Sequence, residues 1–176
     1  MNLYVVRHGE VEHNRLGYYS NQDEDLNENG IKQALELKSK IAKIDYDVCY
    51  CSPLLRTRHT AELINHNGRI IVPIDLLAER DPGKLNGMPI EFTDREEYWN
   101  YFSKVDYGAE TMESLFDRVF TFLDYLKNRP FENVLIVTHS GVSKAIYAYF
   151  HSIPEDGRFL NLGLKNCEIK KYHINK

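Results

Sequence analysis

Long hydrophobic runs are missing from this sequence. The longest strongly apolar run covers only residues 134–137, whereas a helix that spans a bilayer needs about 20 apolar residues. Residues 1–6 have neither a basic start nor the apolar region of roughly 7–15 residues that a signal peptide requires, and Arg7 and His8 follow at once. We therefore expect a cytoplasmic protein with no membrane partner.

The sequence also has few cysteines and no excess of positive charge. The three cysteines, Cys49, Cys51 and Cys167, are too few for a disulfide framework, which favours buried side chains in a reducing compartment. The spacing of the first two does not fit a zinc knuckle. With 22 basic and 26 acidic residues and a net charge of -4, the chain lacks the broad basic field of a nucleic-acid-binding protein. A small basic pocket for a small anion remains compatible with this balance.

The remaining composition is that of one folded unit. The 176 residues are 43% hydrophobic and 27% charged, which is ordinary for a globular domain. No repeat or low-complexity tract interrupts them. We expect residues 1–176 to form a single domain.

Apolar runs and helical periodicities alternate along this chain. Short runs rich in β-branched and apolar residues predict strands at residues 3–6, 48–51, 69–74, 133–138 and, at an edge, 167–174. Apolar spacing near 3.6 residues and the signals of helix starts predict helices over about 28–43, 53–66, 112–126 and 140–151. Ser52 is expected to cap the second helix and Pro53 to occupy its first turn. The alternation predicts an α/β fold with three layers, a mostly parallel sheet and helices on both faces.

Charged side chains follow the predicted strands. Arg7 and His8 end the first strand, Arg56 lies in the first turn of the helix after the second, Glu79 follows the third, and His139 ends the fourth. Ligands of parallel sheets bind beyond the carboxyl ends of the strands. The N–H donors of an arginine guanidinium are arranged so that two of them can bind two phosphate oxygens at once. Two arginines and two histidines at one edge therefore indicate a pocket for a phosphate dianion.

The sequence resembles the histidine phosphatase superfamily, the phosphoglycerate-mutase-like clan, in five blocks that occur in order. These are Arg7-His8-Gly9-Glu10 followed by Asn14; residues 26–30 with Gln33-Ala34; residues 52–61; Glu79-Arg80 with Gly83 and residues 85–87; and residues 137–141. The blocks cover residues 3–145. The resemblance implies a phosphoglycerate-mutase-like fold.

The resemblance also implies a role for each strand-end residue. His8 attacks phosphorus and is transiently phosphorylated, while a backbone carbonyl holds its other ring nitrogen and fixes the tautomer. Arg7, Arg56 and His139 hold the phosphoryl oxygens, and Glu79 protonates the leaving oxygen and then activates water. Charge placement supplies most of such catalysis, so neither a metal nor another cofactor is required.

Further substrate contacts are expected around this centre. Asn14 adds a neutral donor to phosphate, and Ser20, Arg80 and Ser140 lie where substrate contacts are expected. Residues 80–110 are expected to form a small substrate-covering cap. Its aromatic cluster, Tyr98–Phe102, is either packing or a cover for the substrate.

Other functions remain as alternatives. Pro82 stands where mutase relatives carry an aromatic residue, and residues 88–109 are too few for the long mutase insertion, so we predict a phosphatase rather than a phosphoglycerate mutase. Its partner is a small phosphomonoester, with sugar phosphates and α-ribazole phosphate among the candidates. A non-catalytic phosphate-binding protein is a further alternative. His8, Glu10 and His13 could also be interpreted as three ligands of a metal ion, but the positive charge of the adjacent Arg7 argues against a cation there. The oligomeric state is not indicated.

Overall fold

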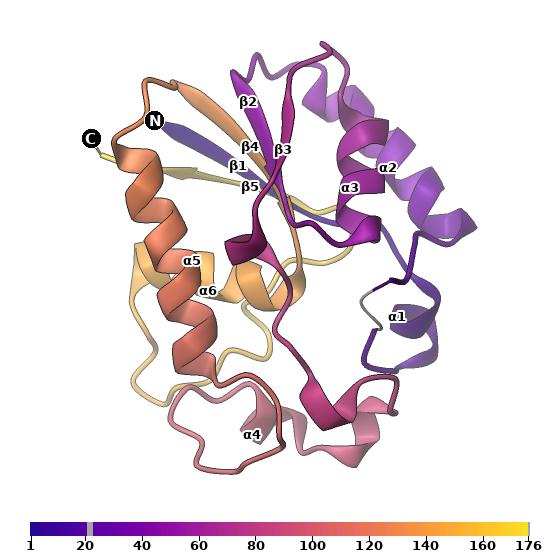
Figure 1. The fold of residues 1–176 in the computed structure, drawn as a ribbon, viewed down its shortest axis with the longest axis vertical. Helices are drawn as coiled ribbons and strands as arrows, with labels where there is room; N and C mark the ends of the chain where they lie inside the picture. Colours follow the sequence, from indigo (N-terminus) through magenta and orange to yellow (C-terminus); the bar gives the residue numbers. More distant parts are fainter. Residues whose placement is uncertain (21–22, 176) are drawn as a thin grey trace.

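The computed structural model describes residues 1–20 and 23–175, and its centre is a five-stranded sheet (Figure 1). The strands are β1 (Asn2–Arg7), β2 (Val48–Cys51), β3 (Ile71–Pro73), β4 (Asn133–Thr138) and β5 (Ile169–His173). Their order in the sheet is β3-β2-β4-β1-β5. The pairs β3–β2, β2–β4 and β4–β1 are parallel, and β5 is antiparallel to β1. The mostly parallel sheet and the edge position of the last strand are confirmed.

Helices cover both faces of the sheet. Helices α2 (Glu28–Ile41) and α3 (Leu55–Ile64) pack on one face, and α5 (Met112–Lys127) and α6 (Ser140–His151) pack on the other (Figure 1). Neighbouring strand residues alternate between the two cores, as Ile136 and Val137 of β4 do. This period of two is what a buried strand imposes, and it confirms the three layers. In the described part of the chain, no helix is long and apolar enough to cross a membrane.

The expected start of α3 is wrong. Ser52 does not cap the helix and Pro53 does not open it, because Leu54 still has an extended backbone, with ψ 141°, and α3 begins at Leu55. The Ser52 N–H donates to Val137 O at 3.1 Å, which continues the strand ladder past β2. This longer ladder delays the helix by two residues and makes Arg56 its second residue.

Several short elements were not predicted. They are α1 (Glu12–Leu16), α4 (Arg95–Tyr98) and the 3₁₀ helices η1 (Asp75–Leu77), η2 (Gly83–Leu85) and η3 (Ile90–Phe92). The third strand is also shorter than expected, at three residues. Such short elements carry too few residues for a periodic signal.

Two glycines let the turn after β1 lie against α2. A Cβ on Gly9 would lie 2.5 Å from Gly30 O, and a Cβ on Gly30 would lie 2.1 Å from Glu10 O. Asn27 caps α2 by accepting the Gly30 N–H at 2.8 Å. This close backbone contact fixes the loop that carries His8.

Residues 80–110 lie beyond the carboxyl ends of the strands (Figure 1). Tyr18 and Pro89 form an isolated bridge, and the Tyr19 N–H donates to Met88 O at 2.9 Å. On the other side, the Phe159 N–H donates to Trp99 O at 2.9 Å. The segment is therefore tied to both the loop after β1 and the loop before β5.

Candidate active site

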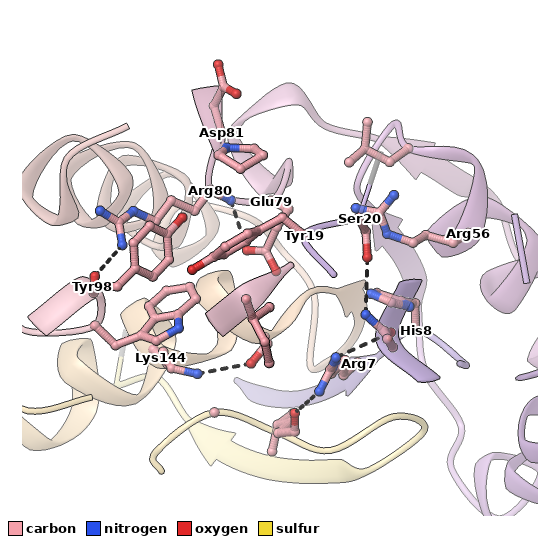
Figure 2. A pocket seen from close by; sticks show the side chains of 18 of the residues that line it. Arg7, His8, Tyr19, Ser20, Arg56, Glu79, Arg80, Asp81, Tyr98 and Lys144 are labelled. Carbon is pink, nitrogen blue, oxygen red and sulfur yellow. Dashed lines mark hydrogen bonds between the residues drawn. The ribbon is translucent and has the colours of Figure 1, made fainter. Parts of the chain in front are cut away.

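A cavity of about 570 Å³ lies between the strand ends and the 80–110 segment (Figure 2). Eight of the nine site residues predicted from the sequence line it: Arg7, His8, Asn14, Ser20, Arg56, Glu79, Arg80 and Ser140. The ninth, His139, lies directly behind His8, with 5.1 Å between the two ring centroids. The structure thus brings all nine residues to one place.

His8 is a buried imidazole with one nitrogen already engaged. Its Nδ1 lies 2.6 Å from Gly9 O. Because a carbonyl only accepts, Nδ1 carries the hydrogen and Nε2 keeps its lone pair. Burial, and then the charges of Arg56 and Arg7, hold the His8 pKa well below its usual range. The ring is therefore neutral near pH 7, which is the form that a nucleophile needs.

Two arginines concentrate positive charge beside this ring. Arg7 donates through Nη1 to Leu164 O at 3.0 Å and lies, through Nη2, 3.5 Å from Asn14 Oδ1. Arg56 has only 2% of its surface exposed and also lines the cavity. Burial lowers the pKa of both guanidiniums, while the Glu79 carboxylate acts in the opposite direction. Two guanidiniums in one cavity, one half-buried and one buried, favour a ligand that carries negative charge.

His139 is held from behind by Ser52. The Ser52 Oγ accepts the Leu54 N–H at 3.2 Å and lies 2.8 Å from His139 Nε2. A Ser52 hydroxyl that donates to Nε2 leaves the imidazole hydrogen on Nδ1. This buried Nδ1 has no hydrogen-bond partner among the described residues. Burial, and then the charges of Arg56 and His8, keep the His139 pKa well below its usual range.

The Glu79 carboxylate lies at the start of α6. Oε1 accepts the N–H groups of Gly141 at 3.0 Å and Arg80 at 2.9 Å, and Oε2 lies 3.2 Å from the Gly141 nitrogen. A Cβ on Gly141 would lie 2.3 Å from Oε1, so only glycine leaves room for this contact. Figure 2 shows Glu79 directed into the cavity between Tyr19 and Arg80.

Two asparagine side chains, Asn14 and Asn166, connect Ser20 with the backbone of His8. Asn14 Nδ2 donates to Ser20 Oγ at 3.1 Å. Asn166 Nδ2 donates to Asn14 Oδ1 at 3.2 Å and to His8 O at 3.0 Å. Sequence reasoning missed Asn166, which lies outside the five blocks and carries no local signal.

The other two predicted contacts are engaged with neighbours. Arg80 donates to Glu110 O at 2.7 Å and to Tyr98 O at 2.6 Å, and its guanidinium lies 4.0 Å from the Tyr98 ring centroid. Ser140 Oγ accepts from Lys144 Nζ at 3.0 Å. Lys144, which also lines the cavity, was not identified from the sequence.

The aromatic cluster Tyr98–Phe102 divides into two parts. Tyr98 and Trp99 line the cavity. Tyr101 packs against Phe116, with ring centroids 5.2 Å apart, and Phe102 is 54% exposed. Within the cluster, Tyr98 and Trp99 therefore face the cavity, and Tyr101 and Phe102 do not line it.

The hypothetical metal triad does not assemble. His13 Nδ1 lies 2.7 Å from Glu24 Oε1, and Glu10 accepts from Asn27 at 3.0 Å. Within residues 1–20 and 23–175, no group of three His, Cys, Asp or Glu side chains is placed to hold a metal ion. Cys49 and Cys51 are free and buried, as expected, whereas Cys167 is free but only half-buried.

Comparison with known proteins identifies the family of this chain. The family model of the histidine phosphatase superfamily (branch 1) matches residues 3–176. The chain belongs to this superfamily. Membership confirms the α/β, phosphoglycerate-mutase-like fold and makes the chain a phosphoric monoester hydrolase.

Similar members of the superfamily span nearly all of the chain. Phosphoserine phosphatase 1 of Hydrogenobacter thermophilus is 31% identical over 185 residues, covering 99% of this chain and 87% of the relative. The metal-independent phosphoserine phosphatase of Arabidopsis thaliana is 33% identical and covers 96% and 76%. The crystal structure of the α-ribazole phosphatase from Shigella flexneri superposes with a TM-score of 0.85 at 26% identity, covering 100% and 92%.

Proposed function

We propose that this histidine phosphatase is a metal-independent phosphomonoesterase that acts on a small phosphorylated metabolite through a phosphohistidine at His8. One observation carries the proposal: a neutral imidazole, with Nδ1 held by Gly9 O, stands beside the guanidiniums of the half-buried Arg7 and the buried Arg56. This arrangement combines a nucleophile with charges that stabilise a phosphoryl group during transfer.

In the first step, Arg7, Arg56 and the Nδ1–H of His139 hold the phosphoryl oxygens, and Asn14 adds a neutral donor. The Nε2 lone pair of His8 forms a bond to phosphorus as the bond from phosphorus to the ester oxygen breaks. Glu79 delivers a proton to that oxygen, and the alcohol leaves. The two guanidiniums offset the charge that spreads over the phosphoryl oxygens.

In the second step, water attacks the phosphohistidine. The Glu79 carboxylate takes the proton of the attacking water, the new bond from oxygen to phosphorus forms, and the bond to Nε2 breaks. Inorganic phosphate leaves and His8 returns to its neutral form. The Glu79 proton lost in the first step is thus regained.

Recognition of the leaving group falls to the remaining cavity wall. Residues 80–110 serve as the cap of a single domain, and Ser20, Arg80 and Ser140 are proposed substrate contacts. The names of the relatives point to phosphoserine and α-ribazole phosphate as candidates beside sugar phosphates. A cytoplasmic location stays a prediction.

The test is hydrolysis of p-nitrophenyl phosphate with a chelator present. We expect turnover to survive the chelator and an acid-labile phosphoenzyme to be trapped by rapid quench. His8→Ala should abolish both, because it removes the proposed nucleophile. Loss of turnover with chelator, or activity of His8→Ala within about tenfold of the native protein, would contradict the proposal.

The same assays separate the alternatives. A phosphoglycerate mutase would isomerise phosphoglycerate while releasing little phosphate. A non-catalytic protein would bind phosphate and turn over no ester.

A further inference from the structure

Lys144 is a buried cation that the phosphatase chemistry does not use. Only 3% of its surface is exposed, yet it lines the cavity. Its Nζ donates to Ser140 Oγ at 3.0 Å. Among the described residues, no carboxylate lies within ion-pair distance of this ammonium. A buried ammonium with neutral partners favours a bound anion.

Trp99 and Gly163 flank the ammonium, and Lys144 also borders the cavity. The Trp99 ring centroid lies 4.5 Å from Nζ. On the other side, a Cβ on Gly163 would lie only 2.4 Å from Nζ, so the absence of a side chain there admits the lysine. Figure 2 shows Lys144 reaching into the cavity from the side opposite Arg56.

Helix α6 sets Lys144 beside the position of the leaving group. Gly141 binds Glu79 through its N–H. Lys144 follows Ser140 by four residues and therefore lies on the same helix face. Glu79 and Lys144 line the same cavity, so the substituent of an ester oxygen that Glu79 protonates lies in the cavity that Lys144 borders.

We propose that Lys144, Ser140 and Trp99 form a second anionic subsite that binds a carboxylate on the leaving group, so that the preferred substrates are small phosphorylated carboxylic acids. This inference rests on the proposed phosphatase function and adds the substrate class. A carboxylate carries one charge and matches one ammonium with neutral neighbours. A second phosphate is a dianion, for which the first subsite supplies two guanidiniums and two imidazoles.

The protonation of Lys144 supports the subsite and adds a second readout. Burial lowers the Lys144 pKa to about 7, the nearby Glu79 raises it, and Arg7 and Arg95 lower it. A bound carboxylate stabilises the ammonium. The preference for carboxylated substrates should therefore weaken as the pH rises through neutrality.

Two pairs of substrates isolate the carboxylate. O-phosphoserine differs from O-phosphoethanolamine, and 3-phosphoglycerate from glycerol 3-phosphate, in having a carboxylate. We expect the native protein to release phosphate from the carboxylated member with a kcat/KM roughly 10- to 100-fold higher, the size of one charge-assisted hydrogen bond. A ratio below about 2 would overturn the inference.

Variants assign the preference to Lys144. Lys144→Met should bring the ratio of kcat/KM between the two members of each pair close to 1, chiefly by raising KM for the carboxylated ester. Lys144→Arg should restore part of this ratio. Lys40→Met, an exposed lysine on α2, should keep the native ratio. An unchanged ratio in Lys144→Met would overturn the inference.

The native protein alone provides a test that does not depend on the folding of a variant. Its ratio should fall between about pH 6 and about pH 9, and a flat ratio would contradict the subsite. p-Nitrophenyl phosphate has no carboxylate and separates the two proposals. If no ester is hydrolysed, p-nitrophenyl phosphate included, the proposed function fails and the inference fails with it. If p-nitrophenyl phosphate is hydrolysed without a carboxylate preference, only the inference fails.

Discussion

The two sides of the cavity are built in different ways. One side, which we call the catalytic floor because it carries the residues proposed for phosphoryl transfer, consists of Arg7, His8, Arg56 and His139. These residues stand at the ends of β1 and β4 and at the start of α3, and His8, Arg56 and His139 are 3%, 2% and 0% exposed. Their backbones belong to or border hydrogen-bonded ladders and helices, so their positions follow from the central sheet.

The opposite side, residues 80–110, has little regular structure. It contains two three-residue 3₁₀ helices and one four-residue α-helix, and Phe92 is 63% exposed. Side-chain contacts, such as Arg80 with Tyr98 O, take the place of a ladder. We infer that the sheet fixes the positions of the catalytic floor, whereas residues 80–110, which contribute Trp99 to the proposed leaving-group subsite, can change without disturbing it.

Substitution in the catalytic floor should give the largest loss of activity, and the loss should be the same for every substrate. We expect Arg56→Met to lower kcat/KM by roughly 10³-fold, because it removes a fixed charge from the transferring phosphoryl group. The loss should be equal for p-nitrophenyl phosphate and for alkyl phosphates in steady-state assays. Arg58→Met, on an exposed position of the same helix, is the control and should behave as the native protein does. A loss confined to one substrate would assign Arg56 to the leaving group instead.

Glu79 lies at the boundary of the two sides, so its effect should depend on the leaving group. Glu79→Gln removes the proton donor and should lower kcat by roughly 10²-fold for alkyl phosphates. p-Nitrophenolate leaves without protonation, so its ester should lose less than about tenfold. Rates measured over a series of leaving-group pKa values would show the change as a steeper slope. An equal loss for all esters would remove Glu79 from the role of acid.

Arg118 supports the Glu79 loop from behind and should give a smaller effect of the same kind. It donates to Leu76 O at 2.7 Å and Ala78 O at 2.8 Å, and lies 3.2 Å from Glu79 O. Its Nε is paired with Glu110 at 2.7 Å. As a positioning residue, Arg118→Met should lower kcat for alkyl phosphates by roughly tenfold through misplacement of Glu79, with little change in KM.

The leaving-group dependence separates positioning from simple destabilisation. Partial unfolding of Arg118→Met would lower the rate for all esters equally, and that outcome would contradict a positioning role. Arg118→Lys keeps one donor and should recover part of the alkyl-phosphate rate. Arg129→Met, an exposed position beyond α5, should leave the leaving-group dependence unchanged.

The catalytic floor could be predicted because its residues directly follow strong local signals. The expected strand at 133–138 and helix at 140–151 match β4 and α6 in both bounds, so the position of His139 followed at once. The expected start of α3 was wrong because a long-range hydrogen bond, from the Ser52 N–H to Val137 O, outweighs the local preference of Ser52 for capping a helix.

The residues that sequence reasoning missed act over long distances along the chain. Asn166 reaches His8 O across 158 positions, and Arg118 reaches Ala78 across 40. Lys144 lies within a predicted helix, but its burial depends on Trp99 and Gly163. No local pattern encodes such contacts, which arise only when the layers pack.

The smallest expected effect concerns stability and again sets the catalytic floor apart. Burial keeps the pKa of His8 and of His139 well below 6.5, so both rings stay neutral in the folded state while the unfolded chain takes up protons. The unfolded state then binds more protons, and the free energy of unfolding falls as the pH drops below about 6.5, by up to about 2 kcal/mol per histidine at about pH 5.

Thermal denaturation in phosphate-free buffer should show this dependence of stability on pH, and His139→Gln should reduce it. His151→Gln, which changes an exposed histidine at the end of α6, should not. A slope that His139→Gln leaves unchanged would show that other groups, and not the buried imidazoles of the catalytic floor, carry the acid sensitivity.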